Sequence, residues 1–271
     1  MAAPNAITPR QLLRLIGTPQ APALIDVRTD ADFKDDPCLI PGAVHHSHDD
    51  VAGIKKLSDD WPCVIICQKG KKLSQGVVSW LQADGVTAEY LEGGMFGWHA
   101  MAGAQSVPVS ALPAPVGGHT LWVTRHRPKI DRIACPWLIR RFVDARARFL
   151  FVAPGEIQGV AEHFGATPFD VEGTHWSHRG DKCTFDTMLD EFTLHSESLN
   201  RMATIVRAAD TNRHDAVPEA AGLLAISVGL SRQYRDDHQQ LEAGLHLYDA
   251  LYRWARDGSE ETHDWPAGHG Q

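Results

Sequence analysis

The sequence predicts an α/β domain with a parallel sheet, followed by an α-rich α+β domain. In the first part, short apolar runs alternate with helical patterns, which is typical of a parallel sheet buried on both faces. In the second part, long helical patterns predominate. Between them, "GAQSVPVSALPAPVGG" is uncharged and rich in Pro, Gly, Ala and Ser, as a linker is. The predicted boundaries are residues 1–104 for the first domain, 105–118 for the linker, 119–262 for the second domain and 263–271 for a tail.

The composition excludes several classes of protein. The 271 residues carry 26 Lys and Arg against 34 Asp and Glu, a formal net charge of -8, so we expect no nucleic-acid partner. No apolar run approaches the roughly 18–20 residues that span a bilayer, and no secretory signal is visible, so we expect no membrane partner. The five cysteines are irregularly spaced and odd in number, which predicts reduced thiols and a cytoplasmic protein. No pattern indicates an oligomeric state.

The first domain is expected to begin with a helix in "TPRQLLRLI", because Thr8 suits an N-cap and Pro9 suits the first helical position. The apolar runs "ALIDV" (23–27) and "CVIIC" (63–67) predict buried parallel strands. A helical pattern over 73–85 follows, and then "AEYL" predicts a further strand. Functional loops in such a unit lie at the carboxyl ends of its strands.

The second domain is expected to contain a small sheet among helices. "TLWVT" and "RFLFV" predict two strands. Helical patterns cover residues 196–210 and 233–258, with Ser196 suited to start the former and Gly258 suited to end the latter.

One cysteine stands where the second buried strand ends, and a lysine-rich loop follows it. Cys67 begins this loop, and a helix is expected from Leu73. Backbone N–H groups and a helix N-terminus favour an anion there and lower the pKa of a thiol. The alternative is a buried cysteine followed by a solvated charged turn. The remaining loop residues are Gln68, Lys69, Gly70, Lys71 and Lys72.

The surroundings of this loop resemble the rhodanese (sulfurtransferase) family. The resemblance rests on "LIDVRTDADFKDDPCLIPGAVH", the cysteine loop and "LEGGMFGWHAM", and it covers roughly residues 5–103. It implies that Cys67 is the catalytic residue, which carries sulfur as a persulfide from a small-molecule donor to a thiol acceptor without a cofactor. It also implies supporting roles for Asp26 and Arg28. Lys72 stands where the family often has arginine, so the resemblance does not identify the sulfur donor.

Basic residues gather at the start of the second domain. Arg125, Arg127 and Arg132 are expected to form an oxyanion-binding cradle, and an ordinary solvated strand-to-helix turn is the alternative. Pro136 suits the first position of a new helix, which would place the thiol of Cys135 at a helix N-cap. A buried structural cysteine is the alternative for this residue.

A third group of residues suggests a metal site. A helix beginning near Lys182 would bring Cys183 and Asp186 onto one face, within reach of His178. Thiolate, imidazole and carboxylate ligands suit Zn²⁺ or Fe²⁺ better than a hard cation. Separate hydrogen bonds and helix caps are the alternative.

The second domain also resembles the C-terminal domain of chromate-resistance (ChrB-type) proteins. The resemblance rests on "WVTRHRPKIDRIACPWLIRRF", "SHRGDKCTFD" and "IVRAADTNR" and adds Asp210 to the metal-site residues. It implies a chromate-resistance accessory enzyme that acts in chromate or thiol stress, with chromate or chromium–thiol complexes as further ligands. A sensor or regulator that binds these species without turnover is the alternative.

Overall fold

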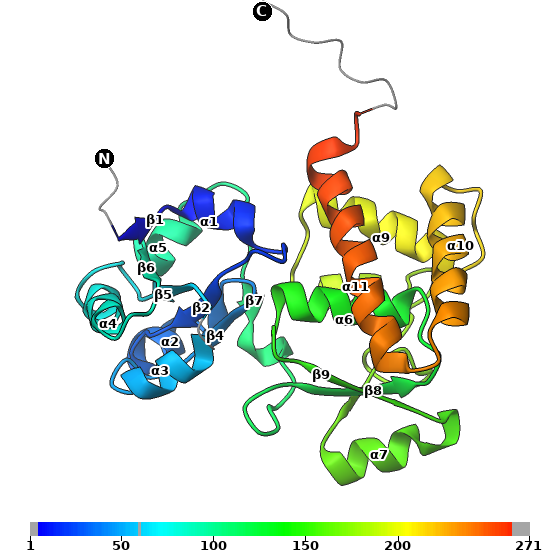
Figure 1. Cartoon of the computed structure of the whole chain (residues 1–271), viewed down its shortest axis with the longest axis horizontal. Helices are drawn as coiled ribbons and strands as arrows, with labels where there is room; N and C mark the ends of the chain where they lie inside the picture. Colours follow the sequence, from blue (N-terminus) through cyan, green and yellow to red (C-terminus); the bar gives the residue numbers. More distant parts are fainter. Residues whose placement is uncertain (1–4, 59–60, 262–271) are drawn as a thin grey trace, which may run out of the picture.

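The computed structural model describes residues 5–58 and 61–261, so the predicted tail lies outside the described residues. Two regions of different architecture follow one another along the chain (Figure 1). The first is an α/β unit with a parallel sheet, and the second is rich in helices around a small sheet, so the predicted fold class is confirmed. None of the helices described is long and apolar enough to cross a membrane.

The first region contains a five-stranded parallel sheet in the order β1-β6-β5-β2-β4. Its strands are β1 (Ala6–Ile7), β2 (Ala23–Asp26), β4 (Ala43–His45), β5 (Cys63–Ile66) and β6 (Ala88–Leu91). Its helices are α1 (Pro9–Leu15), α2 (Asp30–Asp35), α3 (Val51–Ser58), α4 (Lys72–Ala83) and α5 (Gly94–His99). The predicted N-cap is confirmed, because the hydroxyl of Thr8 accepts a hydrogen bond from the backbone N–H of Gln11.

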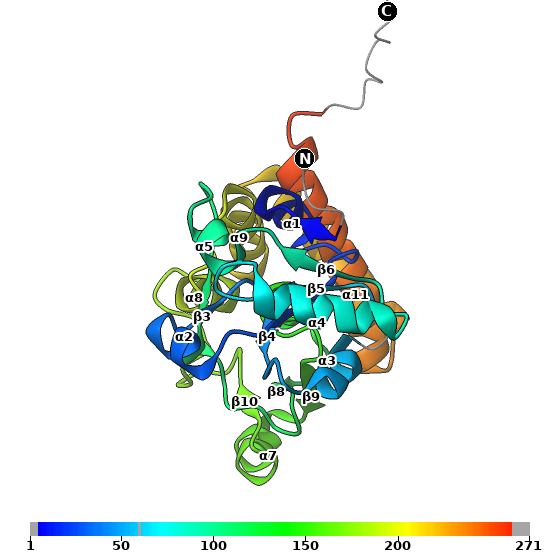
Figure 2. The ribbon, with the colours of Figure 1, turned by 90° about the vertical axis from the view of Figure 1, so that its left-hand side faces the viewer.

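Both faces of this sheet are buried. Ile25 and Ile65 face α3 and α4, which cover the side turned toward the viewer in Figure 2. Leu24 and Val64 point to the opposite face, where they join the residues of α1 and α5 in a core that continues into the second region. Alternate residues of each strand therefore serve two cores, as the continuous apolar runs predicted.

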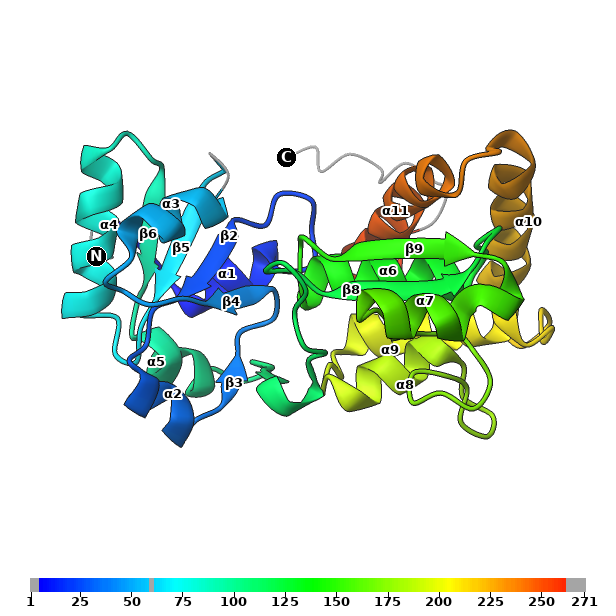
Figure 3. The same cartoon turned by 90° about the horizontal axis from the view of Figure 1, so that it is seen from below.

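The second region is built on a three-stranded parallel sheet in the order β10-β8-β9. Its strands are β8 (Leu121–Arg125), β9 (Arg148–Val152) and β10 (Thr167–Pro168). Its helices are α6 (Asp131–Phe142), α7 (Ile157–Phe164), α8 (Thr184–Glu191), α9 (Glu197–Asp210), α10 (Pro218–Gln233) and α11 (Asp237–Arg253). In Figures 1 and 3, α6 and α7 lie on opposite faces of this sheet. The helix predicted from residue 233 begins at Asp237, because the chain is extended at Tyr234.

The segment 105–118 contacts both regions, because Val107 lies in their common core and the carbonyl oxygen of Ser106 accepts a 2.7 Å hydrogen bond from the hydroxyl of Thr193. Val107 and Pro108 form β7, which pairs antiparallel with β3 (Cys38–Leu39). The backbone N–H of Gly42 donates to the carbonyl oxygen of Phe142 at 2.6 Å, and Arg256 donates to the carbonyl oxygen of Arg14 at 3.0 Å. One hydrophobic core also runs through both regions. The predicted domain boundaries remain predictions.

Candidate functional site

Cys67 directly follows β5, and only 4% of the residue is exposed. Its Sγ lies 3.1 Å from the hydroxyl oxygen of Ser74, in the first turn of α4. The backbone N–H groups of Lys69, Lys71 and Ser74 also point to the sulfur. The loop therefore surrounds the thiol with hydrogen-bond donors, as its sequence predicted.

These donors decide the charge of the thiol. Burial acts to raise the pKa of Cys67, but the hydrogen bonds from the Ser74 hydroxyl and the three backbone N–H groups outweigh it and lower the pKa. A thiolate is the nucleophilic form of cysteine. The side chains of Lys69, Lys71 and Lys72 are exposed, and their charges are not among the main causes of the shift.

Two glycines allow this loop to close. Gly94 has a φ of +58°, and a Cβ there would lie 2.1 Å from the carbonyl oxygen of Cys67. Gly70 has a φ of +62°, and its Cβ would lie 2.4 Å from the carbonyl oxygen of Leu91. Only glycine fits such a close approach of two backbones at positive φ. The N–H of Met95 donates to the carbonyl oxygen of Cys67 at 3.0 Å, so the start of α5 is hydrogen-bonded to the loop.

Asp26 and Arg28 form a fully buried ion pair at 2.7 Å. The guanidinium also donates to the backbone carbonyl oxygens of Asp36 at 3.0 Å and Cys38 at 2.6 Å. The pair therefore organises the chain between β2 and β3, and within the described part of the chain neither side chain hydrogen-bonds to Cys67. The sequence-based reading missed Ser74, because a serine inside a helical pattern carries no signal of its partner.

A second polar cluster lies in the second region, where one imidazole meets three carboxylates. The Nε2 atom of His178 lies 3.6 Å from Asp131, 3.4 Å from Asp170 and 3.2 Å from Asp210. Asp131 begins α6, Asp170 follows β10, and Asp210 ends α9, so three separate elements supply the carboxylates. This acidic cluster borders a surface cavity of about 790 Å³, whose lining includes Asp170 and His178.

Burial of Asp131 distinguishes this cluster from a group of surface charges. Asp131 is 0% exposed, and its Oδ2 accepts a 2.6 Å hydrogen bond from the backbone N–H of Thr184. Its Oδ1 has no hydrogen-bond partner among the described residues. Burial and the neighbouring carboxylates of Asp210 and Asp170 raise its pKa. Hydrogen bonds to Asp170 and Asp210 raise the pKa of His178 to about 10.

Comparison with known families assigns the two regions. Residues 8–101 match the family described as "Rhodanese-like domain", and residues 122–255 match "ChrB, C-terminal domain". The chain joins a rhodanese-like domain to a ChrB C-terminal domain. It is 32% identical over 132 residues to "Protein ChrB" of Cupriavidus metallidurans. That match covers 48% of this chain and 39% of the relative, so it spans about two fifths of the relative's length.

Two solved structures are similar to part of this chain. A protein from Staphylococcus saprophyticus subsp. saprophyticus is 32% identical, with coverage of 34% of this chain and 89% of that chain and a TM-score of 0.30. A rhodanese-like domain protein from Staphylococcus aureus is 27% identical, with coverage of 37% and 96% respectively and a TM-score of 0.32.

The metal-site residues predicted in the ChrB domain separate into two groups. His178 and Asp210 meet in the acidic cluster, together with Asp131 and Asp170. Cys183 is the fully buried N-cap of α8, and burial together with the neighbouring carboxylates raises its pKa. Asp186 accepts a hydrogen bond from the backbone N–H of Cys183 at 3.0 Å and pairs with Arg207 at 2.8 Å. Cys183 and Asp186 thus take part in helix capping and ion pairing, and the predicted four-ligand set remains a prediction.

The predicted cradle of three arginines does not form. Arg125 and Arg132 both pair with Asp170, at 3.6 and 3.2 Å. Arg127 turns away and donates to the carbonyl oxygens of Tyr234, at 2.8 Å, and of Ser231. A positive φ of 57° at Arg127 accompanies this reversal of direction.

The predicted position of Cys135 is also wrong. The helix begins at Asp131, after a tight turn at Ile130, so Pro136 lies inside α6 rather than at its first position. Cys135 is fully buried, and burial raises its pKa. Its thiol is therefore a core group and does not occupy a helix N-cap.

Proposed function

We propose that this chain is a rhodanese-type sulfurtransferase with Cys67 as its nucleophile. The observation that carries the proposal is the set of donors around the sulfur, namely the Ser74 hydroxyl 3.1 Å away and three backbone N–H groups. They stabilise a thiolate, and they can equally stabilise the terminal sulfur anion of a persulfide. The proposed sulfur transfer uses the residues of this loop and no cofactor.

The proposed reaction is a double displacement. The thiolate of Cys67 attacks the outer sulfur of a donor such as thiosulfate, whose S–S bond breaks as sulfite leaves with the bonding electron pair. The enzyme then holds a Cys67 persulfide. A nucleophilic acceptor, a thiolate or cyanide, attacks the terminal sulfur and takes it as a thiolate persulfide or thiocyanate. The bond to Cys67 breaks, and its electron pair restores the thiolate.

Transfer from thiosulfate to cyanide tests this proposal directly. Cys67→Ala is expected to abolish turnover, while Cys63→Ala, which removes a buried thiol from the same strand, is expected to retain it. Equal activity in wild type and Cys67→Ala would contradict the assignment. Wild type with no turnover at all would favour the sensor alternative, particularly if thiosulfate still loads Cys67 once.

For the ChrB domain, the donor set supports binding of Zn²⁺ or Fe²⁺ in the acidic cluster. A cation about 2.0–2.2 Å from carboxylate and imidazole ligands holds those ligands about 3.4 Å apart. The Nε2 atom of His178 lies 3.6 Å from Asp131 and 3.4 Å from Asp170, and ligand atoms of these three residues lie within 4.8 Å of one another. A bound cation would also give a partner to the buried Oδ1 of Asp131.

Elemental analysis of pure protein tests this second site. Wild type is expected to carry metal, of which His178→Ala loses one equivalent and His175→Ala none, because His175 pairs with Glu191 outside the cluster. Metal-free wild type purified without chelator would contradict the proposal. The resemblance to chromate-resistance proteins suggests that both activities serve in chromate or thiol stress, with Arg125 and Arg132 beside the cluster as the remaining oxyanion ligands.

A further inference from the structure

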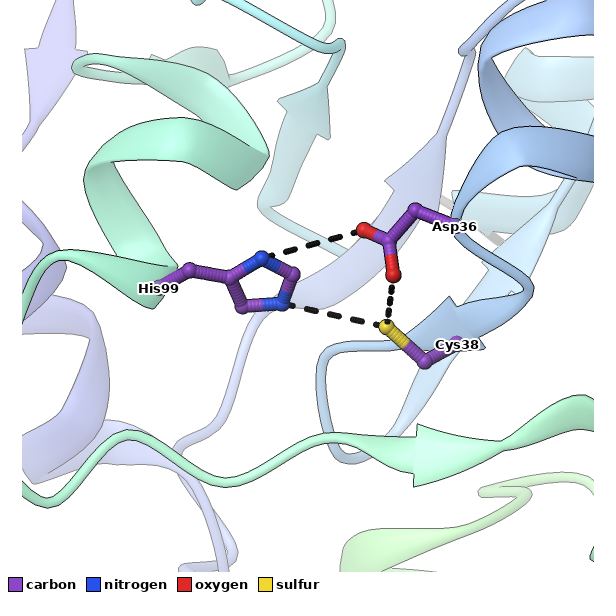
Figure 4. Close-up of side chains that lie close together, drawn as sticks. All are labelled: Asp36, Cys38 and His99. Carbon is purple, nitrogen blue, oxygen red and sulfur yellow. Dashed lines mark hydrogen bonds and ion pairs between the residues drawn. The ribbon is translucent and has the colours of Figure 1, made fainter.

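A third cluster of ligand-type side chains lies in the rhodanese-like domain and belongs to neither site described above. Asp36, Cys38 and His99 converge from the end of α2, β3 and the end of α5 (Figure 4). The Sγ of Cys38 lies 2.9 Å from Oδ1 of Asp36 and 3.8 Å from Nε2 of His99. The Nδ1 of His99 lies 3.7 Å from Oδ2 of Asp36, which closes a triangle.

The backbone of two of these residues is held by buried charge. Arg28 donates to the carbonyl oxygens of Asp36 and Cys38 and also contacts the Asp36 carboxylate at 3.3 Å. Its own charge is balanced by Asp26, which is buried beside it. The hydroxyl of Ser106, just before β7, lies 3.3 Å from Nε2 of His99. The cluster is thus built on fixed backbone rather than on flexible surface chains.

We propose that Asp36, Cys38 and His99 form a binding site for Zn²⁺ or a similar divalent cation of borderline softness. Thiolate, imidazole and carboxylate together are the donors that Zn²⁺ accepts, whereas Mg²⁺ and Ca²⁺ prefer oxygen alone. Tetrahedral bonds of about 2.0–2.3 Å place ligand atoms about 3.4–3.6 Å apart. The three donor atoms lie within 4.8 Å of one another, so small side-chain rotations reach that geometry.

The charges also balance around a divalent cation. One carboxylate and one thiolate neutralise the two positive charges, while Arg28 keeps Asp26 as its partner. The side chains of Asp36 and His99 are 32% and 40% exposed, which gives a cation a path in and leaves a fourth position for water. Three protein ligands with an open position is an arrangement that zinc adopts in proteins.

The same three residues do not suit a cysteine–histidine nucleophile. Burial and the adjacent carboxylate of Asp36 raise the pKa of the Cys38 thiol to about 12. A nucleophilic cysteine needs the opposite environment, in which positive groups or N–H donors stabilise the thiolate. A cation supplies that stabilisation, because a coordinating thiol is deprotonated.

Cobalt binding tests the proposal with a signal that only a thiolate ligand produces. The full-length parent carries Cys67→Ala and His178→Ala, so that neither of the two sites described above contributes. Added Co²⁺ is expected to bind at one equivalent with a thiolate-to-metal charge-transfer band, and Zn²⁺ is expected to displace it. Cys38→Ser should remove the band. His99→Ala should weaken Co²⁺ binding at least about tenfold, since even loss of an outer hydrogen-bond partner costs that much.

His48→Ala is the matched control, because His48 lies in the same domain and its recorded ion pair is with Asp49. It should leave Co²⁺ binding unchanged. A parent without a thiolate band, or a band that survives Cys38→Ser, would overturn the proposal. If Cys38→Ser does not fold without metal, His99→Ala decides, since its side chain is 40% exposed and its unchanged affinity would equally exclude the site.

Discussion

The cysteine loop after β5 and the turn before α8 both place a thiol beside a helix N-terminus, yet they act on it in opposite directions. The pKa of Cys67 is lowered by the Ser74 hydroxyl and backbone N–H groups, despite burial. The pKa of Cys183 is raised by burial and by the carboxylates of Asp131 and Asp186. A helix N-terminus alone therefore does not make a cysteine reactive. The other polar groups around the sulfur determine whether its pKa is lowered or raised.

This difference extends to the ligand that each domain is suited to hold. The cysteine loop of the rhodanese-like domain collects donors and therefore favours an anion on sulfur. The acidic cluster of the ChrB domain collects three carboxylates around His178 and therefore favours a cation. Variants that alter the cysteine loop and leave the acidic cluster intact, or the reverse, can separate stabilisation of the anion from binding of the cation.

Among variants that keep the thiol of Cys67, the largest effect is expected from Gly94→Ala. Its Cβ would lie 2.1 Å from the carbonyl oxygen of Cys67 at a φ of +58°, so the loop must shift. Displacement of a reacting group by about 1 Å costs about 100-fold, and we expect sulfur transfer to fall at least that much. Gly76→Ala in α4 is the control, with nothing within 4 Å of its Cβ and full activity expected. Full activity in Gly94→Ala would contradict the proposed role of loop closure.

Ser74→Ala should act through the charge of the thiol. A hydrogen bond to a charged group contributes about 1.5–3 kcal/mol, so the thiolate population at neutral pH should fall about tenfold or more. Alkylation of Cys67 is expected to slow by that factor and its pH profile to move to higher pH. Ser79→Ala, on an exposed part of the same helix, should behave as wild type. An unshifted profile in Ser74→Ala would exclude this hydrogen bond as a cause.

A smaller effect is expected on the pH dependence of stability. The pKa of His178 is raised to about 10, against about 6.5 in an unfolded chain. Protonated His178 therefore stabilises the folded, metal-free protein fully below about pH 6.5, and this contribution is lost as pH rises toward 10. The difference in melting temperature between wild type and His178→Ala should shrink over that interval. A constant difference would show that His178 does not titrate with the acidic cluster.

The smallest effect is expected from the lysines. Lys71→Ala and Lys72→Ala remove exposed charges that solvent and salt screen, so transfer should fall by less than about threefold. Rates measured over a range of salt concentrations check this. A tenfold or larger loss would mean that ammonium charge, rather than the hydroxyl and backbone donors, stabilises the sulfur anion.

Local signals predicted the cysteine loop well. A buried strand, a cysteine, a glycine and a helical pattern follow each other within residues 63–83, so the sequence order alone sets their geometry. The helix begins at Lys72, one residue earlier than expected. The hydroxyl of Ser74 could not be assigned, because the direction of a side chain in a first helical turn depends on where the strand before it ends.

The acidic cluster was only partly predictable, because its members are distant in sequence. Asp131, Asp170 and Asp210 meet through the packing of α6, β10 and α9, which no short spacing encodes. The predicted helical face with Cys183 and Asp186 was based on local spacing alone. In the folded protein, tertiary packing places the thiol of Cys183 in the core. Pro136 was wrongly predicted at the first position of a helix for a related reason, because the turn at Ile130 lets α6 begin at Asp131.

The most direct test is to determine which cysteine carries an added sulfur atom after the protein is incubated with thiosulfate. Peptide mapping by mass spectrometry under non-reducing conditions is expected to find one added sulfur atom on the peptide that contains Cys67, and none on those of Cys135 or Cys183. Cys67→Ala should carry no added sulfur. Added sulfur on a peptide other than that of Cys67, or an unmodified Cys67 in wild type, would contradict the assignment of the cysteine loop as the seat of a sulfur anion.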